Sequence, residues 1–508
     1  MFPKTILTII IGFCCLLPTT TQAFNQSISS QNPKLANTFL QWTISDQEAV
    51  WLAKWDVLIL DMENQANNPG AIKKIRHLNP DITILAYISS QEIRSDAYVN
   101  SQTSLRRQML TDIPAEWYLP DSKGQKVSFW PETWMLNISS ECPVVNGQRF
   151  NDYLPQFIQK NILSTGLWDG IFYDNLWDSV SWLNNGQIDL DNDGRQETPE
   201  NLNQDWRSGV LSMLQKTRRL IGYDYILMAN SSSLAGYHKY LNGRLYENFP
   251  VLGDGQGTWQ SVIDDYQALK KINVWPQIYV INSTNNLQTD YQKMRFGLAT
   301  CLLFNDLYFS YDKKVSDHNQ IWWYDEYNFS LGLPRGPAYL ASTTSATEPL
   351  WRRDFQNGSV LLNNNLNSVT VDLGGNNLKR ISGRQDKKTN NDLAVRNIVI
   401  SYLDGLILEK KITLTNEYLK NGYDYSVYNS LGQTIHSPIK LTVKNYKPGQ
   451  LIKVDSKGRA ATVKARVMPK NFKLPKALVW ASQKGARYDI LAADVNGDGL
   501  KEYLIAKY

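Results

Sequence analysis

With 508 residues, the chain is longer than a single hydrophobic core usually serves, so a large domain with one or two small ones is expected. Its 53 Lys and Arg residues nearly balance 48 Asp and Glu residues, and no basic stripe stands out. This charge pattern argues against a nucleic-acid-binding protein.

The N-terminus has the pattern of a secretory signal peptide. Lys4 precedes an apolar run over residues 6–17, and a Thr-rich stretch leads to Ala23. The run is shorter than the roughly 20 residues of a membrane-spanning helix, so cleavage after Ala23 is favoured over an uncleaved anchor. The sequence therefore predicts a signal peptide over residues 1–23 and a secreted protein. The mature chain keeps only Cys142 and Cys301, which excludes a disulfide scaffold.

Strand-like and helix-like segments alternate from residue 38 onward. Helices are predicted over 70–78, 153–163, 202–221, 259–271 and 290–304, and strands over 38–44, 57–62, 82–89, 170–175, 225–231, 244–249, 274–282 and 307–312. Eight strands in this alternation predict an α/β fold, a (β/α)8 TIM barrel over residues 35–345. An open doubly wound sheet is the alternative, but no GxGxxG loop follows the first strand.

A long excursion over residues 90–151 separates the third and fourth predicted strands. It holds Trp117, Trp130 and Trp134 and several prolines. Loops after the strands of such a barrel build its carboxyl-end face. We therefore expect this excursion to form one wall of a cleft there.

The sequence changes texture after the predicted barrel. Short strands over 358–363, 369–373, 397–401 and 406–414 predict a small antiparallel β domain within residues 349–440. Residues 441–508 form a predicted linker followed by a propeller-repeat-like segment, which resembles a single FG-GAP or VCBS repeat.

Acidic residues end four of the predicted strands. Asp61 and Asp312 end the second and the eighth, and the acid–Asn doublets Asp174-Asn175 and Glu247-Asn248 end the fourth and the sixth. Strand-end acids often cap helices or pair with Arg and Lys. Two carboxylates that face one cleft, however, are what glycoside hydrolysis requires, so Asp174 and Glu247 are the predicted catalytic pair.

Several strings resemble hypothetical glycosyl hydrolase family fifteen: Trp168–Asn175, Arg295–Ala299, Tyr308–Asp312, Trp322–Tyr327, Leu331–Pro334 and Trp351–Gly358. The resemblance covers roughly residues 35 to 410. The family is similar to endo-α-1,4-polygalactosaminidases and more remotely to α-galactosidase-like barrels. It implies a retaining glycosidase with Asp174 as nucleophile and Glu247 as general acid/base, acting on an α-linked polysaccharide, with a galactosamine polymer as one candidate by analogy.

The two roles ask for different environments. A nucleophilic Asp must stay ionised, whereas an acid/base Glu needs a raised pKa, for which Tyr246, Phe249 and Pro250 are candidate apolar neighbours.

Aromatic and polar side chains near the strand ends are candidate substrate contacts. The 16 Trp and 27 Tyr residues favour stacking on sugar rings, although many such rings form core. The predicted substrate-binding residues are Trp42, Asp61, Tyr87, Trp130, Trp134, Asn175, Asn230, Asn248, Tyr279 and Asp312.

Two segments resemble calcium-binding loops. The first offers Asp189, Asp191, Asp193, the Arg195 carbonyl and Glu200 at the spacing of a calcium loop, and a solvated acidic turn is the alternative. The second offers Asp494, Asn496, Asp498 and Glu502 within the propeller-like segment. Calcium is the only cofactor predicted.

Other function classes lack their signatures. The four histidines show no zinc spacing, no GxSxG occurs, and no His-rich metal site or Lys/Tyr base pair indicates a deacetylase or a lyase. A catalytically silent carbohydrate-binding protein of the same fold remains the alternative to a glycosidase.

Overall fold

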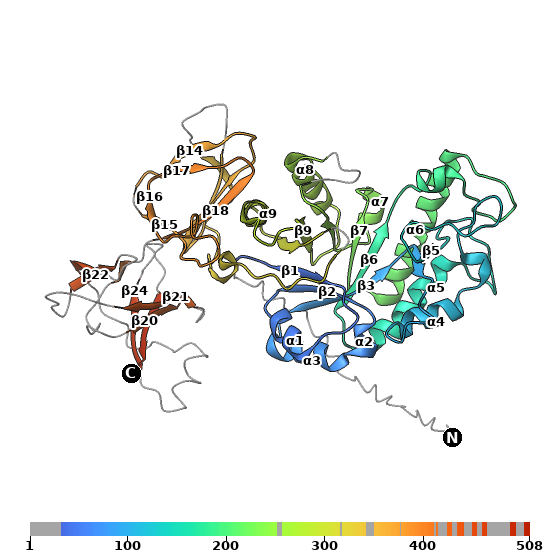
Figure 1. Ribbon diagram of the computed structural model, residues 1–508, viewed down its shortest axis with the longest axis horizontal. Helices are drawn as coiled ribbons and strands as arrows, with labels where there is room; N and C mark the ends of the chain where they lie inside the picture. Colours follow the sequence, from blue (N-terminus) through green and yellow to red (C-terminus); the bar gives the residue numbers. More distant parts are fainter. Residues whose placement is uncertain are drawn as a thin grey trace, which may run out of the picture.

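The computed structural model describes residues 32–410 except 251–256, 315–316, 342–349 and 376, and beyond residue 410 only the strands β19 to β25. Eight parallel strands form one sheet in the order β1-β2-β3-β6-β7-β8-β9-β10 (Figure 1). A parallel bridge between Leu35 and Phe309 joins the two edges. The predicted TIM barrel is confirmed. Its strands are β1 (Ala36–Phe39), β2 (Val57–Asp61), β3 (Thr83–Ser89), β6 (Gly170–Leu176), β7 (Ile226–Ser231), β8 (Gly243–Tyr246), β9 (Tyr279–Thr284) and β10 (Leu307–Asp312).

Helices follow most barrel strands and cover their outer faces. The longer helices bury an apolar stripe, as α3 does with Ala71, Ile72 and Ile75. The helices are α1 (Asp46–Leu52), α2 (Asn64–Asn67), α3 (Pro69–Leu78), α5 (Phe150–Phe157), α6 (Pro199–Ile221), α7 (Ala235–His238), α8 (Trp259–Lys270) and α9 (Tyr291–Leu302).

Two predicted strands are shifted in the structure. The first ends at Phe39 rather than residue 44, so Trp42 lies on the connection that follows. The seventh begins at Tyr279 rather than residue 274, because Pro276 has no N–H to give to a ladder. Tyr279 therefore lies at the amino end of its strand.

The predicted long excursion carries its own small elements. Strands β4 (Glu92–Arg94) and β5 (Thr133–Met135) pair with each other, and α4 (Ser104–Asp112) lies between them in sequence. Figure 1 shows β5, α4, α5 and α6 gathered on one side of the barrel. This excursion stands beside the carboxyl ends of β3 and β6.

A small antiparallel β domain follows the barrel, as predicted. Its six-stranded sheet has the order β11-β12-β13-β18-β15-β16, and β14 pairs with β17. The strands are β11 (Tyr339–Ala341), β12 (Leu350–Asp354), β13 (Gly358–Asn363), β14 (Val369–Asp372), β15 (Leu378–Arg380), β16 (Ala394–Val395), β17 (Asn397–Ile400) and β18 (Asp404–Lys410).

Helix α9 lies between the barrel and this domain (Figure 1). Every residue from Met294 to Leu302 is buried, because one side of the helix covers the barrel and another side meets β18. Arg295 makes two hydrogen bonds to Asp404 at 3.0 and 2.9 Å, and a methyl group on Gly405 would collide with the Arg295 carbonyl.

The remaining segments test fewer predictions. Beyond residue 410, a four-stranded sheet consists of β20 (Asp424–Tyr428), β21 (Thr434–Lys440), β24 (Tyr488–Ala493) and β25 (Glu502–Lys507). A three-stranded sheet consists of β19 (Thr413–Leu414), β22 (Gln450–Val454) and β23 (Ala460–Lys464). The propeller-like repeat and its calcium loop stay predictions, because residues 494–501 lie outside the described residues, as does the signal peptide.

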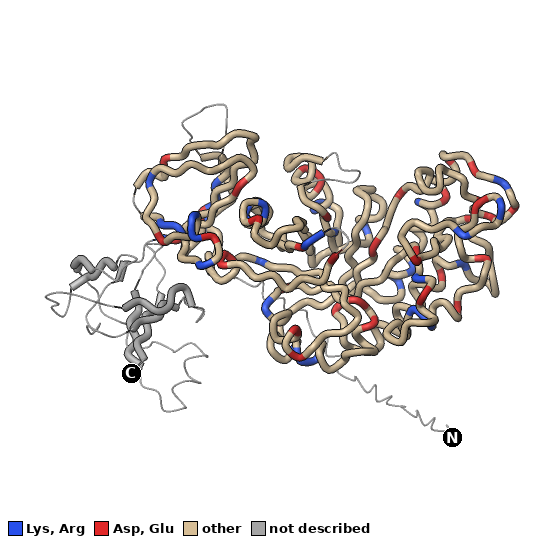
Figure 2. The backbone as a smooth tube through the Cα atoms, viewed as in Figure 1, with Lys and Arg blue, Asp and Glu red and all other residues tan. Residues whose placement is uncertain are grey.

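Cys142 and Cys301 are buried free thiols. None of the described helices has the length and apolar character that crossing a bilayer requires. Figure 2 shows both signs of charge interspersed along the described backbone.

Candidate active site

The alternation of side chains along the barrel strands places the candidate site. Phe172, Met228 and Leu245 belong to the apolar cluster inside the barrel. Side chains two residues apart on a strand point to the same side. Asp174, Asn230 and Glu247 follow these three residues by two positions, so they extend the same interior column at the carboxyl end.

The two acid–Asn doublets share a backbone feature. Asn175 has φ 56° and Asn248 has φ 54°, both in the left-handed region that Asn enters more readily than most residues. The regular strand geometry therefore breaks immediately after Asp174, and the chain turns directly after Glu247. Asn248 itself accepts a hydrogen bond from the Thr284 hydroxyl at 2.7 Å and does not line the pocket described below.

One side-chain amide connects the two carboxylates. Nδ2 of Asn230 lies 3.2 Å from Oδ1 of Asp174 and 3.0 Å from Oε2 of Glu247. The two carboxylates therefore face each other across a single donor. The structure brings together the acids that the sequence singled out, and Asn230 is the residue that spans them.

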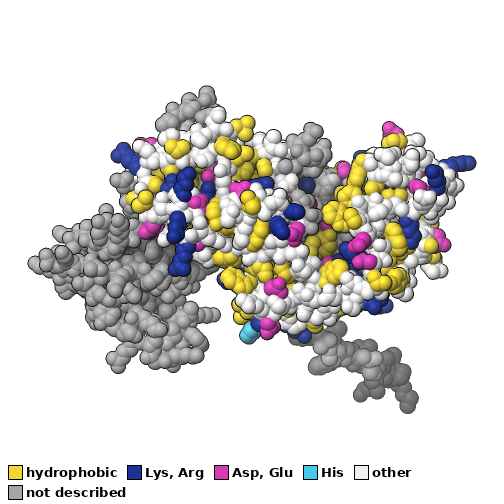
Figure 3. All heavy atoms as spheres, viewed as in Figure 1, with side chains coloured by type: hydrophobic (Ala, Val, Ile, Leu, Met, Phe, Trp, Pro, Cys, Tyr) yellow, Lys and Arg dark blue, Asp and Glu magenta, His cyan; other side chains and the backbone are white. Residues whose placement is uncertain are grey.

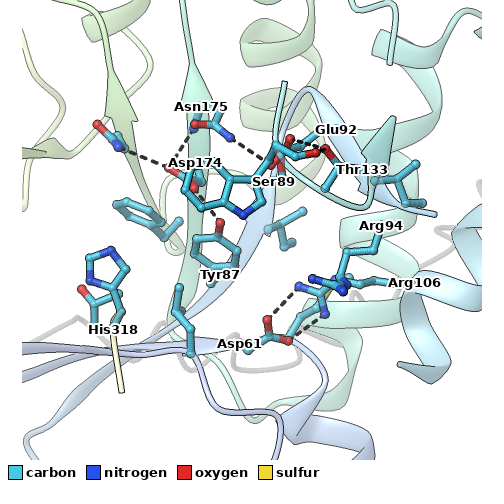
Figure 4. A pocket seen from close by; sticks show the side chains of 18 of the residues that line it. Asp61, Tyr87, Ser89, Glu92, Arg94, Arg106, Thr133, Asp174, Asn175 and His318 are labelled. Atoms are coloured by element: carbon cyan, nitrogen blue, oxygen red, sulfur yellow. Dashed lines mark hydrogen bonds and ion pairs between the residues drawn. The ribbon is translucent and has the colours of Figure 1, made fainter. Parts of the chain in front are cut away.

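Asp174 is held by further donors. The Tyr87 hydroxyl lies 2.5 Å from Oδ2, and the Asn175 backbone N–H donates to Oδ1 at 2.9 Å (Figure 4). Burial raises the pKa of Asp174 and the charge of Glu247 raises it further, while the Tyr87 and Asn175 hydrogen bonds lower it.

Glu247 faces a histidine that the sequence did not single out as functional. Nε2 of His318 lies 3.2 Å from Oε1 of Glu247, and Nδ1 lies 3.0 Å from Oδ2 of buried Asp312. Burial alone would lower the pKa of His318, but the hydrogen bonds to Asp312 and Glu247 raise it to about 10. The two carboxylates therefore favour the protonated form of His318.

The apolar neighbours expected around Glu247 point elsewhere. The Tyr246 hydroxyl donates to Asp265 at 2.8 Å, and the Phe249 ring stacks on Phe296 with centroids 5.8 Å apart. Asp265 lies in α8 and Phe296 in α9, so both side chains face the helices outside the barrel. Glu247 is thus set among polar partners, which corrects the sequence-based expectation.

A pocket of about 430 Å³ opens at these carboxylates. Figure 4 shows Asp174 pointing into it above Tyr87, with His318 on another wall. The predicted residues that line it are Asp174, Glu247, Trp42, Asp61, Tyr87, Trp130, Asn175 and Asn230.

Four predicted substrate contacts do not line this pocket. Besides Asn248, they are Tyr279, Trp134 and Asp312. The Tyr279 hydroxyl bonds to Asn273, the Trp134 ring packs against Tyr118, and Asp312 is buried beneath His318. Asp312 is thus covered by a pocket residue, whereas Tyr279 lies at the amino end of β9, away from the pocket.

Charged residues from the long excursion complete the pocket wall. Arg106 bonds to both oxygens of Asp61 at 2.9 and 2.7 Å, which gives this strand-end acid the structural role of an ion pair. Glu92 and Arg94 also line the pocket. Burial raises the pKa of Glu92 to about 7, with a further contribution from Asp174. The excursion therefore forms a cleft wall, as predicted.

The first predicted calcium loop brings together a different set of carboxylates from the one that the spacing indicated. Carboxylate oxygens of Asp189, Asp191 and Glu197 lie within 4.8 Å of one another. Asp193 instead accepts a hydrogen bond from the Arg195 N–H, and Glu200 lies in the first turn of α6. Oε2 of Glu197 is buried and has no hydrogen-bond partner within the described chain. Glu197, rather than Glu200, therefore lies beside Asp189 and Asp191.

Comparison with known proteins identifies the family. Residues 76–359 match the model of hypothetical glycosyl hydrolase family 15, and the comparison with curated proteins finds no match. The structure is similar to isomaltulose synthase from Klebsiella sp. LX3, at 9% identity and a TM-score of 0.44, over 74% of this chain and 98% of that one. It is also similar to a cyclic alpha-maltosyl-(1→6)-maltose hydrolase from Arthrobacter globiformis, at 9% identity and a TM-score of 0.36, over 74% and 98% of the two chains. The family match spans more than half of the 508 residues, and the chain therefore belongs to hypothetical glycosyl hydrolase family 15 and is a glycoside hydrolase.

Proposed function

We propose that this enzyme cleaves a glycosidic bond in a polysaccharide with retention of configuration, using Asp174 as nucleophile and Glu247 as general acid/base. The Asn230 bridge carries the proposal. Oδ1 of Asp174 and Oε2 of Glu247 both accept from Nδ2 of Asn230, at 3.2 and 3.0 Å. These two oxygens are therefore closer together than the roughly 6.5 to 9.5 Å that separates the carboxyl groups of an inverting pair. An inverting enzyme needs that larger gap to admit a water molecule between acid and base.

The reaction proceeds in two balanced steps. The Asp174 carboxylate attacks the anomeric carbon while the bond to the leaving oxygen breaks, and Glu247 gives its proton to that oxygen. Water then attacks the glycosyl ester, Glu247 takes the water proton, and Asp174 leaves as a carboxylate. Tyr87, Asn175 and Asn230 all donate to Asp174, which stabilises its charged form before attack and after release.

His318 supports the acid/base role of Glu247. Its cationic ring holds a proton 3.2 Å from Oε1 of Glu247, and Asp312 fixes the ring from the other side. Once Glu247 has given its proton to the leaving oxygen, this ring donates to the resulting carboxylate and stabilises it until the water proton arrives. Asp312 accepts a hydrogen bond from Asn282 at 2.6 Å, so the whole arrangement is anchored in the barrel.

Chemical rescue distinguishes the two carboxylates. In Asp174→Gly supplied with azide and a glycoside with an activated leaving group, we expect a glycosyl azide of inverted configuration. In Glu247→Ala, azide should give the retained configuration. The opposite stereochemistry would exchange the two roles, and release of a hemiacetal with inverted configuration by the wild type would overturn the retaining mechanism.

The substrate is tested by reducing-end release from a panel of α-linked polysaccharides that includes a galactosamine polymer, with Asp174→Asn as the blank. Release by the wild type alone supports the proposal. Retention of a polysaccharide without release by either protein would favour the catalytically silent carbohydrate-binding protein.

We further propose that residues 1–23 direct secretion. Lys4, the apolar run over 6–17 and Ala23 support it. Sequencing of the exported protein from its N-terminus should begin at Phe24. Retention of Met1 in the exported protein would contradict cleavage at this site.

We also propose that calcium binds at Asp189, Asp191 and Glu197. Clustered carboxylate oxygens are the ligands that a hard cation prefers, and the buried Oε2 of Glu197 fits such an ion because no hydrogen bond satisfies it. The ion would tie the segment after β6 to the start of α6. Its role is structural, since none of these residues lines the pocket.

A further inference from the structure

Four aromatic side chains form a continuous strip that begins in the pocket and leaves it. Phe129 and Trp130 line the pocket, and their ring centroids are 6.1 Å apart. Phe129 packs edge to face against Trp177 at 4.7 Å and against Trp182 at 5.6 Å. We call Phe129, Trp130, Trp177 and Trp182 the aromatic strip.

The strip joins two separate segments of the chain. Phe129 and Trp130 come from the long excursion between β3 and β6, whereas Trp177 and Trp182 lie in the segment that follows β6, the strand that carries Asp174. Trp177 and Trp182 also pack against each other, with centroids 5.0 Å apart and planes at 67°. Nε1 of Trp182 donates to the Ser179 carbonyl at 2.9 Å, which fixes the indole. These contacts give the rings set orientations.

The strip is exposed although its members are large and apolar. Phe129 is 38%, Trp130 45% and Trp182 50% exposed. Such a group of aromatic side chains on a surface is typical of a binding site, because single exposed apolar residues are scattered rather than packed together. Figure 3 shows that hydrophobic side chains occur in groups on the face of the described residues that it draws.

We propose that the aromatic strip binds successive sugar units of a glycan chain that extends out of the pocket. This proposal rests on the proposed function, because the occupant is the part of the substrate that continues beyond the cleaved bond. Continuity with the pocket favours a glycan over another occupant, since a chain held at Asp174 and leaving past Phe129 meets the other rings in turn. Pyranose rings present an apolar C–H face that stacks on an aromatic ring, while their hydroxyls stay in water. The enzyme then holds polymeric substrates across several subsites.

Affinity electrophoresis tests the strip without requiring cleavage. The full-length Asp174→Asn protein is run in native gels that contain dextran, pullulan, soluble starch, galactan or a galactosamine polymer. We expect at least one of them to retard it, and Trp182→Ala in the same background to weaken that retardation about tenfold, as loss of one stacking contact does. Because Trp182 is half exposed, the melting temperature of the Trp182→Ala protein should equal that of the Asp174→Asn parent.

Trp275→Ala is the matched control. Trp275 is 66% exposed and precedes β9, so it lies at the amino end of the barrel, opposite the pocket. The Trp275→Ala substitution should leave the retardation unchanged. Equal retardation of the Trp182→Ala and parent proteins, or retardation by none of the five polysaccharides, would overturn the strip as a glycan-binding surface. Either result leaves the azide-rescue stereochemistry intact, so failure of the strip is separable from failure of the two-carboxylate mechanism.

Discussion

The Tyr87 hydroxyl lies closer to the Asp174 carboxylate than any other donor found on it, at 2.5 Å against 2.9 Å and 3.2 Å for Asn175 and Asn230. Burial raises the pKa of Asp174, with the charge of Glu247 adding to it, and the Tyr87 hydrogen bond opposes both effects. Tyr87 therefore helps to keep the proposed nucleophile ionised.

Tyr87→Phe should raise the pKa of Asp174 further. A nucleophile must be charged, so the acidic limb of kcat/KM should move to higher pH. Loss of a hydrogen bond to a charged group, about 1.5 to 3 kcal/mol, should lower kcat roughly tenfold to a hundredfold. The ring stays in place, since it stacks on Phe172. Tyr98→Phe, at an exposed tyrosine, is the control, and an unmoved acidic limb in Tyr87→Phe would contradict this role.

His318→Gln should slow the hydrolysis of substrates with poor leaving groups more than that of dinitrophenyl glycosides. An activated leaving group departs without a proton, so it bypasses the acid that His318 supports. Initial rates on the two substrate classes measure the difference. Equal losses on both would mean that His318 only maintains the fold of the site.

The stability contribution of His318 should depend on pH. Its pKa rises from 6.5 to about 10 in the folded protein, so the stabilisation is fully present below pH 6.5 and is lost as the pH rises through 10. Urea unfolding should therefore show the gap between the wild type and His318→Gln shrinking over this range. A gap that stays constant from pH 6.5 to 10 would argue against a protonated His318.

Calcium removal should lower the melting temperature, because a ligand bound only by the native state adds stability. Glu197→Gln should abolish the response to a chelator, whereas Glu200→Gln should keep it, since only Glu197 joins the carboxylate cluster. Thermal melts with and without chelator compare the three proteins. If Glu200→Gln abolished the response to the chelator instead, the ligand set predicted from the spacing would be the correct one.

Arg295→Ala should destabilise the fold by about 3 to 5 kcal/mol, because it leaves Asp404 buried without its partner. Arg396→Ala breaks an exposed pair with Asp372 and should cost less than about 1 kcal/mol. Denaturant unfolding of both variants gives the comparison. Similar losses of unfolding free energy in the two variants would show that the buried contact does not join the barrel to the β domain.

The sequence predicted the barrel because each strand carries apolar residues that only a buried parallel sheet accommodates. It also predicted Asp174 and Glu247, since strand ends mark the functional face. It missed Glu92, Arg106 and His318 as pocket residues, because they lie on connections that follow barrel strands, away from the strand ends where functional side chains are expected. Tyr279 shows the reverse error. It was recognised as an aromatic residue of a barrel strand, but this strand begins later than predicted, so Tyr279 lies at the amino end of the barrel.

The burial of α9 on both sides has a consequence for how this protein unfolds. Helix α9 packs against two cores, so it cannot stay folded if one of them is lost. Arg295 and Gly405 form the close contact between α9 and β18. The barrel and the strands up to β18 should therefore melt in one cooperative transition. A chain cut after residue 345 would expose the buried side of α9 and aggregate, so the catalytic unit of this enzyme extends to residue 410.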